Sequence, residues 1–581
     1  MRVMNRRLPL AVAIVAPLIS ALILAGCGSG AGSHGTGRGG SPATGGTPGA
    51  GGSTGGAAGS LAAGAAGIST GGSTGGAGGG QAGGATASGG HGGTAGRGGA
   101  AGAGTAAGGA AGGHGGTAGG HGGSGGAKAA VTPASGATLV KVDPTARRQT
   151  FEGWGTSLCW WANHVGSWSA SARNAVVDAL VDPSSGLGYN VFRYNIGGGD
   201  DPSHHHMRQW GDIPGFEPSK GTWDWTADAN QRAVLQQIVA RAGAGVILEA
   251  FSNSPPYWMT KSGCASGSTD GTNNLKDAST ADFADYLTEV VKHYRDSWGV
   301  TFRTVEPLNE PVANWWKANG DQEGCHFDVS SQQQIVKAVA SSLTAKGLTD
   351  TTVSASDENS IDDAVKGLQS FDTTALAGMS QMNTHTYSGG SSSRASLRAL
   401  ATKDGKRLWQ SETGPLSVTL NDTTDAALFM AGRIMTDLRD LQPNAWVDWQ
   451  IGDPSQNWAT VTLNDGQQSF APLKRFYVQA GFSRFIRPGA AMLALSGPDM
   501  VGALAPDGQS IAVVIRNGDT SAAESFTFDL TPLDTVGAQV TVYRTSRTEN
   551  LATLAPIAID KWSFTVAIPA YSVTTLVIPL K

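Results

Sequence analysis

Residues 301–311 read TFRTVEPLNEP, and this stretch indicates the fold more clearly than any other. Its first part is rich in β-branched and aromatic residues, which predicts a strand over Thr301–Asn309. The strand runs into a proline-flanked turn that carries Glu310. A short strand that delivers a carboxylate at its carboxyl end is the pattern expected of a parallel α/β barrel.

The same pattern recurs along the chain. Seven more segments are predicted as strands: Thr150–Thr156, Tyr189–Ile196, Gly245–Ser252, Thr352–Asp357, Met379–Tyr387, Arg407–Glu412 and Ala445–Ile451. Helical patterns lie between most of them: Ala170–Val181, Ala227–Ala242, Ala281–Trp298, Ser331–Ala345, Ile361–Phe371, Asp425–Leu441 and Pro472–Phe485. Eight strands that alternate with helices predict a (β/α)8 TIM barrel over residues 137–487.

The sequence pattern changes after Arg487-Pro488-Gly489. Short alternating segments separated by turn residues follow: Ser510–Arg516, Ser525–Leu530, Gln539–Tyr543, Ser563–Ile568 and Ser572–Ile578. They predict an all-β sandwich over residues 488–581. An early strand near Leu139–Val142 precedes the barrel and is a candidate to join that sandwich.

The first 136 residues have a different character. Residues 1–27 carry arginines, then an apolar run, which is a signal-peptide pattern too short for a stable membrane span. Their end, Leu24-Ala25-Gly26-Cys27, resembles a bacterial lipobox, in which the cysteine is lipid-modified; the alternative is an ordinary cleaved signal with a chance cysteine. From Gly28 to Gly126, 47 of 99 residues are glycine. Such a segment cannot bury enough apolar surface to fold, so residues 28–136 are expected to be a disordered linker.

These features predict an exported protein, either a cell-surface lipoprotein of the outer membrane or cell envelope or a secreted one. Membrane contact is expected only through lipid on Cys27. The net charge is -5 and no basic cluster stands out, so no nucleic-acid partner is expected. We expect a monomer. In an oxidising compartment a disulfide between Cys264 and Cys325 is favoured, because both follow strands that are neighbours in the barrel, and Cys159 would be free and buried.

Two glutamates lie at the ends of predicted barrel strands. Glu310 ends the fourth strand and Glu412 ends the seventh. Those strands face one another across the barrel mouth, where active sites of this fold lie. Two opposed carboxylates are what retaining glycoside hydrolysis requires, one as acid and one as nucleophile. Glu306, deeper on the fourth strand, is expected to be structural and paired with an arginine.

Six motifs appear in order and together resemble glycoside hydrolase family 30. They are Phe151-Glu152-Gly153-Trp154-Gly155, Phe192-Arg193-Tyr194-Asn195-Ile196-Gly197-Gly198-Gly199, Ser252-Asn253-Ser254-Pro255-Pro256-Tyr257-Trp258-Met259, Asn309-Glu310-Pro311, Ser411-Glu412-Thr413-Gly414 and Phe482-Ser483-Arg484-Phe485-Ile486-Arg487-Pro488-Gly489. The segment Gly199-Asp200-Asp201-Pro202 most resembles the endo-β-1,6-galactanase-like branch. The resemblance therefore implies hydrolysis of β-linked galactan side chains of arabinogalactan-type polysaccharide, with retention and without a metal or organic cofactor.

The resemblance also implies roles for single residues. Glu310 would be the acid/base and Glu412 the nucleophile, with Arg193 keeping that nucleophile ionised and Tyr387 donating a hydrogen bond to it. Asn309 would bind the 2-hydroxyl of the reacting sugar and Trp449 would lie beneath that sugar. The other residues expected to bind substrate are Trp154, Asp200, Asp201, Asn253 and His385.

Several alternatives stay open at this point. Asp200 and Asp201 either bind sugar hydroxyls or form a turn. His204-His205-His206 invites a metal interpretation, but consecutive residues do not easily face one ion, so a polar loop is favoured. Trp315 and Trp316 either line the leaving-group side of the site or one of them packs beneath its loop. The sugar could instead be that of a xylanase, β-1,6-glucanase or glucosylceramidase, and a non-catalytic surface carbohydrate-binding protein is a further possibility.

Overall fold

The computed structural model describes residues 128–209, 211–416 and 420–581. The expected signal segment, Cys27 and all but the last nine residues of the expected linker lie outside the described residues. Among the described residues, no helix has the length and apolar character needed to cross a membrane.

Eight parallel strands close into a barrel in the order β10-β3-β4-β5-β6-β7-β8-β9. They are β3 (Gly153–Ser157), β4 (Val191–Asn195), β5 (Ile247–Phe251), β6 (Thr304–Glu306), β7 (Thr352–Ser360), β8 (Met379–Ser388), β9 (Arg407–Glu412) and β10 (Ala445–Asp448). Large apolar side chains such as Trp409 and Val447 fill part of its interior. The expected (β/α)8 barrel is confirmed.

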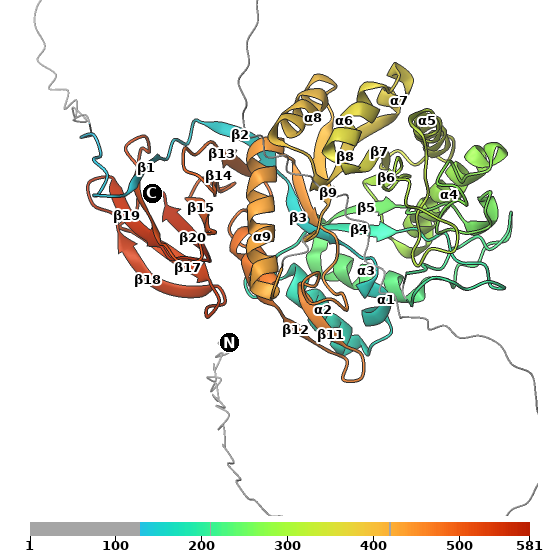
Figure 1. The fold of residues 1–581 in the computed structure, drawn as a ribbon, viewed down its shortest axis with the longest axis horizontal. Helices are drawn as coiled ribbons and strands as arrows, with labels where there is room; N and C mark the ends of the chain where they lie inside the picture. The colour runs from blue at the N-terminus through green and yellow to red at the C-terminus, as the bar shows by residue number, and fades with distance from the viewer. Residues whose placement is uncertain (1–127, 210, 417–419) are drawn as a thin grey trace, which may run out of the picture. The chain divides into compact units, whose positions relative to one another are not determined.

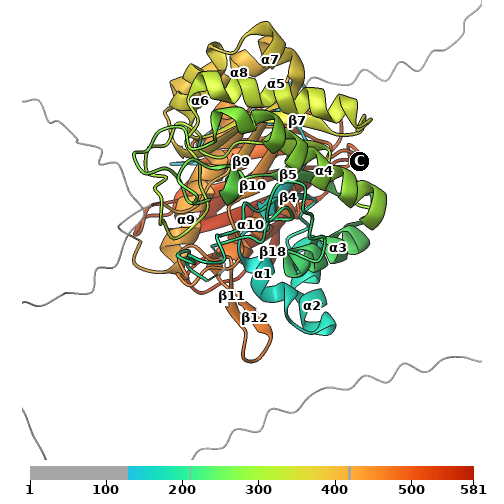
Figure 2. The ribbon, with the colours of Figure 1, turned by 90° about the vertical axis from the view of Figure 1, so that its right-hand side faces the viewer.

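Helices surround these strands, as Figure 2 shows for α3 to α9. They are α1 (Trp161–Gly166), α2 (Ala170–Val181), α3 (Ala229–Ala242), α4 (Thr280–Trp298), α5 (Val329–Ala345), α6 (Ile361–Gln369), α7 (Thr373–Gly378), α8 (Ser391–Lys403), α9 (Thr423–Thr436) and α10 (Lys474–Ser483). Short turns η1 (Gly243–Gly245), η2 (Tyr257–Met259) and η3 (Asp277–Ser279) lie in the loops, and the π-helix η4 (Asp437–Leu441) extends α9.

Several helix starts follow directly from the sequence. The side chains of Ser169, Asp328, Ser360 and Asp422 accept backbone N–H groups at the starts of α2, α5, α6 and α9. Such a cap satisfies a donor that the first turn leaves without a partner, and it contributes about 1 kcal/mol.

The structure differs from the expected elements in three places. The single strand expected over Thr150–Thr156 is two strands, because β2 (Arg147–Phe151) leaves the barrel and pairs antiparallel with β13 of the C-terminal domain. The fourth barrel strand contains only Thr304–Glu306, since the chain then turns toward the active site. The helices α1, α7 and α8 were not anticipated, and α8 begins Ser391-Ser392-Ser393, which lacks apolar periodicity.

The C-terminal domain is all-β, as expected. A seven-stranded sheet has the order β18-β17-β20-β15-β14-β13-β2, and a three-stranded sheet has the order β1-β16-β19. Its strands are β1 (Thr138–Lys141), β13 (Ala490–Leu493), β14 (Met500–Leu504), β15 (Ser510–Asn517), β16 (Glu524–Asp529), β17 (Gln539–Thr545), β18 (Ala552–Ala558), β19 (Ser563–Ile568) and β20 (Ser572–Pro579). The cyan β1 lies among the red C-terminal strands in Figure 1 and pairs in parallel with β16. A hairpin of β11 (Val461–Asn464) and β12 (Ser469–Pro472) lies between β10 and α10.

Helices α9 and α10 connect the barrel to the C-terminal domain. Thr575 donates to the carbonyl of Gly481 at 2.7 Å, and Arg547 forms ion pairs with Asp422 and Asp425 at the start of α9. The C-terminal domain therefore braces the outside of the barrel.

Candidate active site

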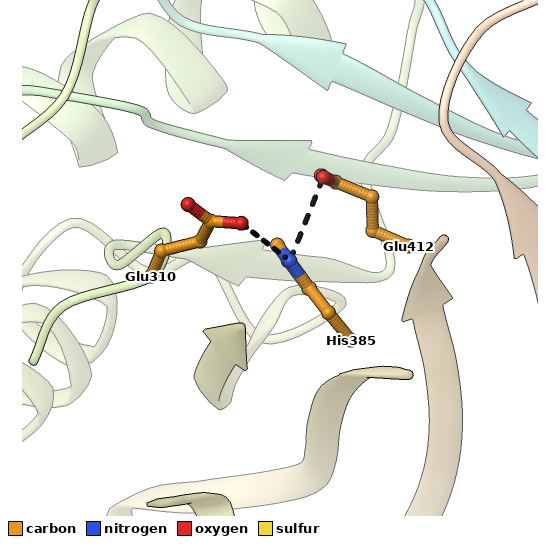
Figure 3. Close-up of side chains that lie close together, drawn as sticks. All are labelled: Glu310, His385 and Glu412. Atoms are coloured by element: carbon orange, nitrogen blue, oxygen red, sulfur yellow. Dashed lines mark hydrogen bonds and ion pairs between the residues drawn. The ribbon is translucent and has the colours of Figure 1, made fainter. Parts of the chain in front are cut away.

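Glu310 and Glu412 meet at the carboxyl ends of the barrel strands, with His385 between them (Figure 3). Glu412 is the last residue of β9, and Glu310 follows β6 by four positions. One ligand atom from each of the three side chains lies within 4.8 Å of the others. Carboxyl groups of retaining glycosidases stand about 5 Å apart, whereas inverting enzymes need about 6.5–9.5 Å. The geometry therefore suits a nucleophile and an acid/base that act on one anomeric carbon.

His385, on β8, contacts three carboxylates at once. Its Nδ1 lies 3.2 Å from Glu310 Oε1 and 3.5 Å from Glu412 Oε1, and its Nε2 lies 3.4 Å from Asp357 Oδ2. The side chain is completely buried. The ring therefore links the carboxylates of Glu310 and Glu412 to a buried aspartate beneath them.

A charged network lies beneath Glu412. Arg193, in the middle of β4, donates to Glu249 Oε1 at 2.8 Å and to Asp357 Oδ2. Its Nη1 lies 3.7 Å from Glu412 Oε2. Glu249 in turn accepts from Thr304, Ser354, Gln381 and Asn383. Arg193 is fully buried, so its charge acts on Glu412 from within the barrel and is not open to a bound molecule.

Glu310 has a strained backbone that aims its side chain. Glu310 has φ +47° and Asp357 has φ +57°, both in the left-handed region that disfavours residues with a Cβ. The N–H of Glu310 donates to the carbonyl of Asp357 at 2.9 Å, which joins the two turns. Asn359 Nδ2 donates to Glu310 Oε1 at 2.6 Å. Such conformations cost about 1–3 kcal/mol each and persist where the surroundings fix them.

Burial and neighbouring charge set the protonation of the site. Burial raises the pKa of Glu412 to about 7, and Glu310 adds to this shift while His385 and Arg193 oppose it. Burial alone would lower the pKa of His385, but Glu412 and Asp357 outweigh it and raise that pKa to about 10. Burial also opposes ionisation of Asp357, yet Arg193 and His385 hold the pKa of Asp357 well below its ordinary value. At neutral pH His385 is therefore an imidazolium between carboxylates.

Other expected residues gather around this cluster. Tyr387 donates to Glu412 Oε1 at 3.0 Å, as expected. The backbone N–H of Trp449 donates to the carbonyl of Thr413, beside the nucleophile, and its ring meets that of Trp160 edge-on at 5.3 Å. Asn309 and Asn253 are buried, and the Oδ1 atom of each has no hydrogen-bond partner within the described part of the chain.

Trp154 does not belong to the site, which corrects its assignment as a substrate-binding residue. Residues of β3 alternate between the two faces of the barrel wall. Ser157 is in register with the inward Arg193, so Trp154 points outward. There its Nε1 donates to the carbonyl of Ile486 at 2.8 Å and its ring packs on that of Phe482.

In the loop after β4, polar side chains contact other residues of the same loop and residues of the loop after β6. Asp201 Oδ1 accepts from the N–H and hydroxyl of Ser203, and Asp200 Oδ1 lies 3.3 Å from His206 Nε2. The turn-forming role of the two aspartates is thus the one that the contacts support. His204 contacts Asn319 at 2.6 Å, whereas His205 and His206 both lie near Asp200, so the three histidines do not converge on one point.

Two further expectations are wrong. Cys264 and Cys325 are free thiols, as is Cys159, whose free and buried state was expected. Cys264 Sγ faces Asn319 Oδ1, whereas Cys325 Sγ faces the carbonyl of His326, so the two sulfurs have different surroundings. Among the described residues no arginine forms an ion pair with Glu306: its Oε1 accepts from the N–H of Leu308, and Arg193 acts on it only through its charge. Burial and then the nearby carboxylates raise the pKa of Glu306 well above its ordinary value.

Asp357, Asn359 and Glu249 are the residues of the site that sequence reasoning missed. Asp357 ends the predicted strand Thr352–Asp357, so the rule that located Glu310 and Glu412 at strand ends would also have located it. Asn359 follows two positions later. Glu249 lies inside a strand and carried no comparable signal.

The side chains of Glu310, His385 and Glu412 also have the composition of a small cation site. An imidazolium carries a proton on both ring nitrogens and cannot donate a lone pair to a metal. Because three carboxylates hold His385 in that form, the cluster suits proton chemistry better than metal ligation.

Comparison with known proteins agrees with this geometry. Residues 137–369 match the model of O-Glycosyl hydrolase family 30. The chain is 36% identical over 426 residues to an endo-beta-1,6-galactanase of Hypocrea rufa, an alignment that covers 70% of this chain and 86% of that protein. It is 26% identical to an exo-beta-1,6-galactobiohydrolase of Bifidobacterium longum, over 66% of this chain and 34% of that longer protein.

The fold has solved counterparts as well. The catalytic domain of GH30 xylanase C from Talaromyces cellulolyticus superposes with a TM-score of 0.59 at 21% identity, covering 76% of this chain and 99% of that one. At this identity the likeness concerns the fold alone.

Proposed function

This chain belongs to O-glycosyl hydrolase family 30, and we propose that it is an endo-β-1,6-galactanase that cleaves galactan side chains of arabinogalactan-type polysaccharide. The observation that carries the proposal is the 36% identity to an endo-beta-1,6-galactanase along 86% of its length. The paired carboxylates Glu310 and Glu412 supply the chemistry that this activity needs.

The reaction proceeds by two displacements. Glu412 attacks the anomeric carbon while protonated Glu310 gives its proton to the departing glycosidic oxygen, which breaks the glycosidic bond. Glu310, now a carboxylate, takes a proton from water, and the oxygen of that water displaces Glu412 from the sugar. The second inversion restores the original configuration, and both carboxyl groups return to their starting protonation.

The surrounding groups stabilise each stage. The His385 imidazolium stabilises negative charge on whichever of Glu310 and Glu412 is ionised, because its Nδ1 lies within 3.5 Å of both. Tyr387 orients the attacking carboxylate through its hydrogen bond. The Oδ1 atoms of Asn309 and Asn253 have no hydrogen-bond partner within the described chain, and a buried polar atom without a partner costs free energy. They are therefore suited to accept hydrogen bonds from sugar hydroxyls.

A direct test compares polymers. We would incubate the full chain with β-1,6-galactan, xylan, β-1,6-glucan and glucosylceramide, beside a Glu412→Gln control, and analyse the released sugars. Short galactooligosaccharides from galactan alone, absent in the control, are expected. Release from another polymer alone would overturn the choice of sugar. No release by the folded wild type from any of them would favour a carbohydrate-binding protein.

We also propose that the protein is exported and held at the cell surface by lipid on Cys27, acting as a monomer. The support is the sequence Leu24-Ala25-Gly26-Cys27 after an apolar run, followed by a glycine-rich segment long enough to act as a tether. A clickable fatty acid should label the wild type and not Cys27→Ala, and light scattering of detergent-solubilised protein should give the mass of one chain. Wild type found unlabelled in the medium would contradict the anchor.

A further inference from the structure

Trp315 is unusual among the aromatic side chains of the described chain. Its relative exposure is 47%, and the other large hydrophobic side chains with high exposure are the aliphatic Leu139 and Leu416. Trp449, beside the nucleophile, is only 9% exposed. An exposed indole offers a flat apolar face that a ligand can cover.

The loop that carries Trp315 is fixed by contacts before and after it, beginning with the N–H of Ala313, which donates to the carbonyl of Glu310 at 3.0 Å. Trp316, the next residue, is buried, and its Nε1 donates to the carbonyl of Glu310 at 3.2 Å. A Cβ on Gly324 would lie 2.2 Å from the Trp316 ring, so a glycine is required there for the ring to fit. Ala318 donates to the carbonyl of Ser268 at 2.8 Å, which fastens the following turn. Trp315 is therefore an exposed ring on a fixed backbone, which lowers the entropy lost on binding.

The position of this ring relative to the two carboxylates determines which sugar it can meet. Trp315 follows the acid/base by five residues, and its ring meets the ring of Trp316 edge-on at 6.1 Å. The acid protonates the oxygen that leaves with the departing part of the polymer. Trp316 donates to the carbonyl of Glu310 and its ring meets that of Trp315, so Trp315 lies on the side of Glu310, whereas the N–H of Trp449 contacts the carbonyl of Thr413, next to Glu412.

We infer that Trp315 is a stacking platform for a sugar ring on the leaving-group side of the site, and that it makes the enzyme favour long chains over short substrates. The inference rests on the proposed cleavage of a β-linked galactan and adds a subsite to it. The C–H-rich face of a pyranose covers an indole well, since both surfaces are flat and apolar. High exposure is what a polymer requires, because the bound chain continues outward into solvent.

The test uses two substrates that differ on the leaving-group side. Soluble β-1,6-galactan places sugars against Trp315, whereas 4-nitrophenyl β-1,6-galactobioside has only an aryl leaving group. Trp315→Ala should lower kcat/KM for galactan about three- to tenfold and change it less than twofold for the aryl substrate. Trp315→Phe, which keeps a flat ring, should recover most of the activity on galactan. Leu139→Ala, which removes an exposed side chain far from the site, should change neither.

An equal loss on both substrates, or no loss on either, would overturn the subsite. The choice of galactan can be wrong independently of the subsite. If the wild type cleaves xylan or β-1,6-glucan instead, the effect of Trp315→Ala on kcat/KM is compared between that polymer and its matching aryl glycoside. A wild type that cleaves no polymer would overturn both the subsite and the proposed function.

Discussion

Arg193 and Arg475 are both buried against barrel strands, and each is paired with carboxylates, yet the two clusters differ in completeness. Arg475 on α10 binds both oxygens of Asp448 at 2.6 and 2.7 Å, and Gln479 and Thr460 donate to the same carboxylate. Neither oxygen of Asp448 is left without a partner. Both oxygens of this carboxylate on the outer face of the barrel are thus partnered within the protein, although Arg475 Nε has no hydrogen-bond partner among the described residues.

The cluster in the barrel mouth is different. Arg193 and His385 face four carboxylates, those of Glu249, Asp357, Glu310 and Glu412, and Glu412 Oε2 has no hydrogen-bond partner within the described residues. Several carboxylates buried close together disfavour one another's ionisation, and burial with the charge of Glu310 raises the pKa of Glu412 to about 7. The comparison indicates that a buried carboxylate whose oxygens all have hydrogen-bond partners, such as Asp448, stabilises the fold. A buried carboxylate with an unpartnered oxygen, such as Glu412, is free to react with a bound substrate.

Glu412→Gln should produce the largest effect on activity. The amide cannot attack the anomeric carbon, so kcat should fall by about 10⁴-fold or more. The free energy of unfolding should change by less than about 1 kcal/mol, because removing a buried charge offsets the lost contacts with His385 and Arg193. Steady-state kinetics and urea unfolding measure both. A large loss of stability would place Glu412 with the structural cluster instead.

Asp448→Asn likewise replaces a carboxylate by an amide, but in the cluster of Arg475 and Asp448. It should lower stability and leave activity unchanged, the opposite of Glu412→Gln. It leaves Arg475 buried without a counter-charge, which costs about 3–5 kcal/mol of unfolding free energy. Activity per folded molecule should remain. If kcat of the folded fraction fell as far as it does in Glu412→Gln, the distinction between the clusters would not hold.

Asp357→Asn should give an intermediate effect. Loss of the charged contacts to Arg193 and His385 should lower kcat/KM about ten- to hundredfold. The variant removes a charge that raises the pKa of His385, so the alkaline limb of the pH–activity profile should move to lower pH. Unchanged limbs with lowered kcat would show that Asp357 acts only through packing.

The contact between His385 and Asp357 also affects how stability depends on pH. The folded-state pKa of His385 is raised to about 10 from an ordinary 6.5, so its stabilising contribution is complete below about pH 6.5 and is lost as pH rises toward 10. The difference in unfolding free energy between the wild type and Asp357→Asn should therefore shrink over that range.

Of the three active-site variants, Tyr387→Phe should have the smallest effect on activity. It removes one hydrogen bond of 3.0 Å to the nucleophile, which predicts a loss of about tenfold in kcat with little change in KM. A melting temperature near that of the wild type is expected, because the ring remains. A rise in KM without a change in kcat would mean that the hydroxyl binds substrate rather than the nucleophile.

The sequence was sufficient to predict the barrel and the meeting of Glu310 and Glu412 at its mouth, because strand ends are readable from local pattern and the fold dictates where those ends meet. Arg193, Asn309, His385 and Tyr387 also lie in or beside the cluster. Sequence pattern could not tell which way Trp154 faces, because that depends on the register between β3 and β4. The partners of Cys264, Cys325 and Glu306 depend on the paths of long loops, which carry no periodic signal.

The central claim is that Glu412 attacks the sugar. Mass-spectrometric peptide mapping after incubation with 2-deoxy-2-fluoro-β-galactobiosyl fluoride tests it most directly, because the fluorine slows hydrolysis of the covalent intermediate. We predict one label per molecule on Glu412, absent from Glu412→Gln. A label on Glu310 or any other carboxylate would contradict the account, and so would cleavage of the polymer with inversion of anomeric configuration.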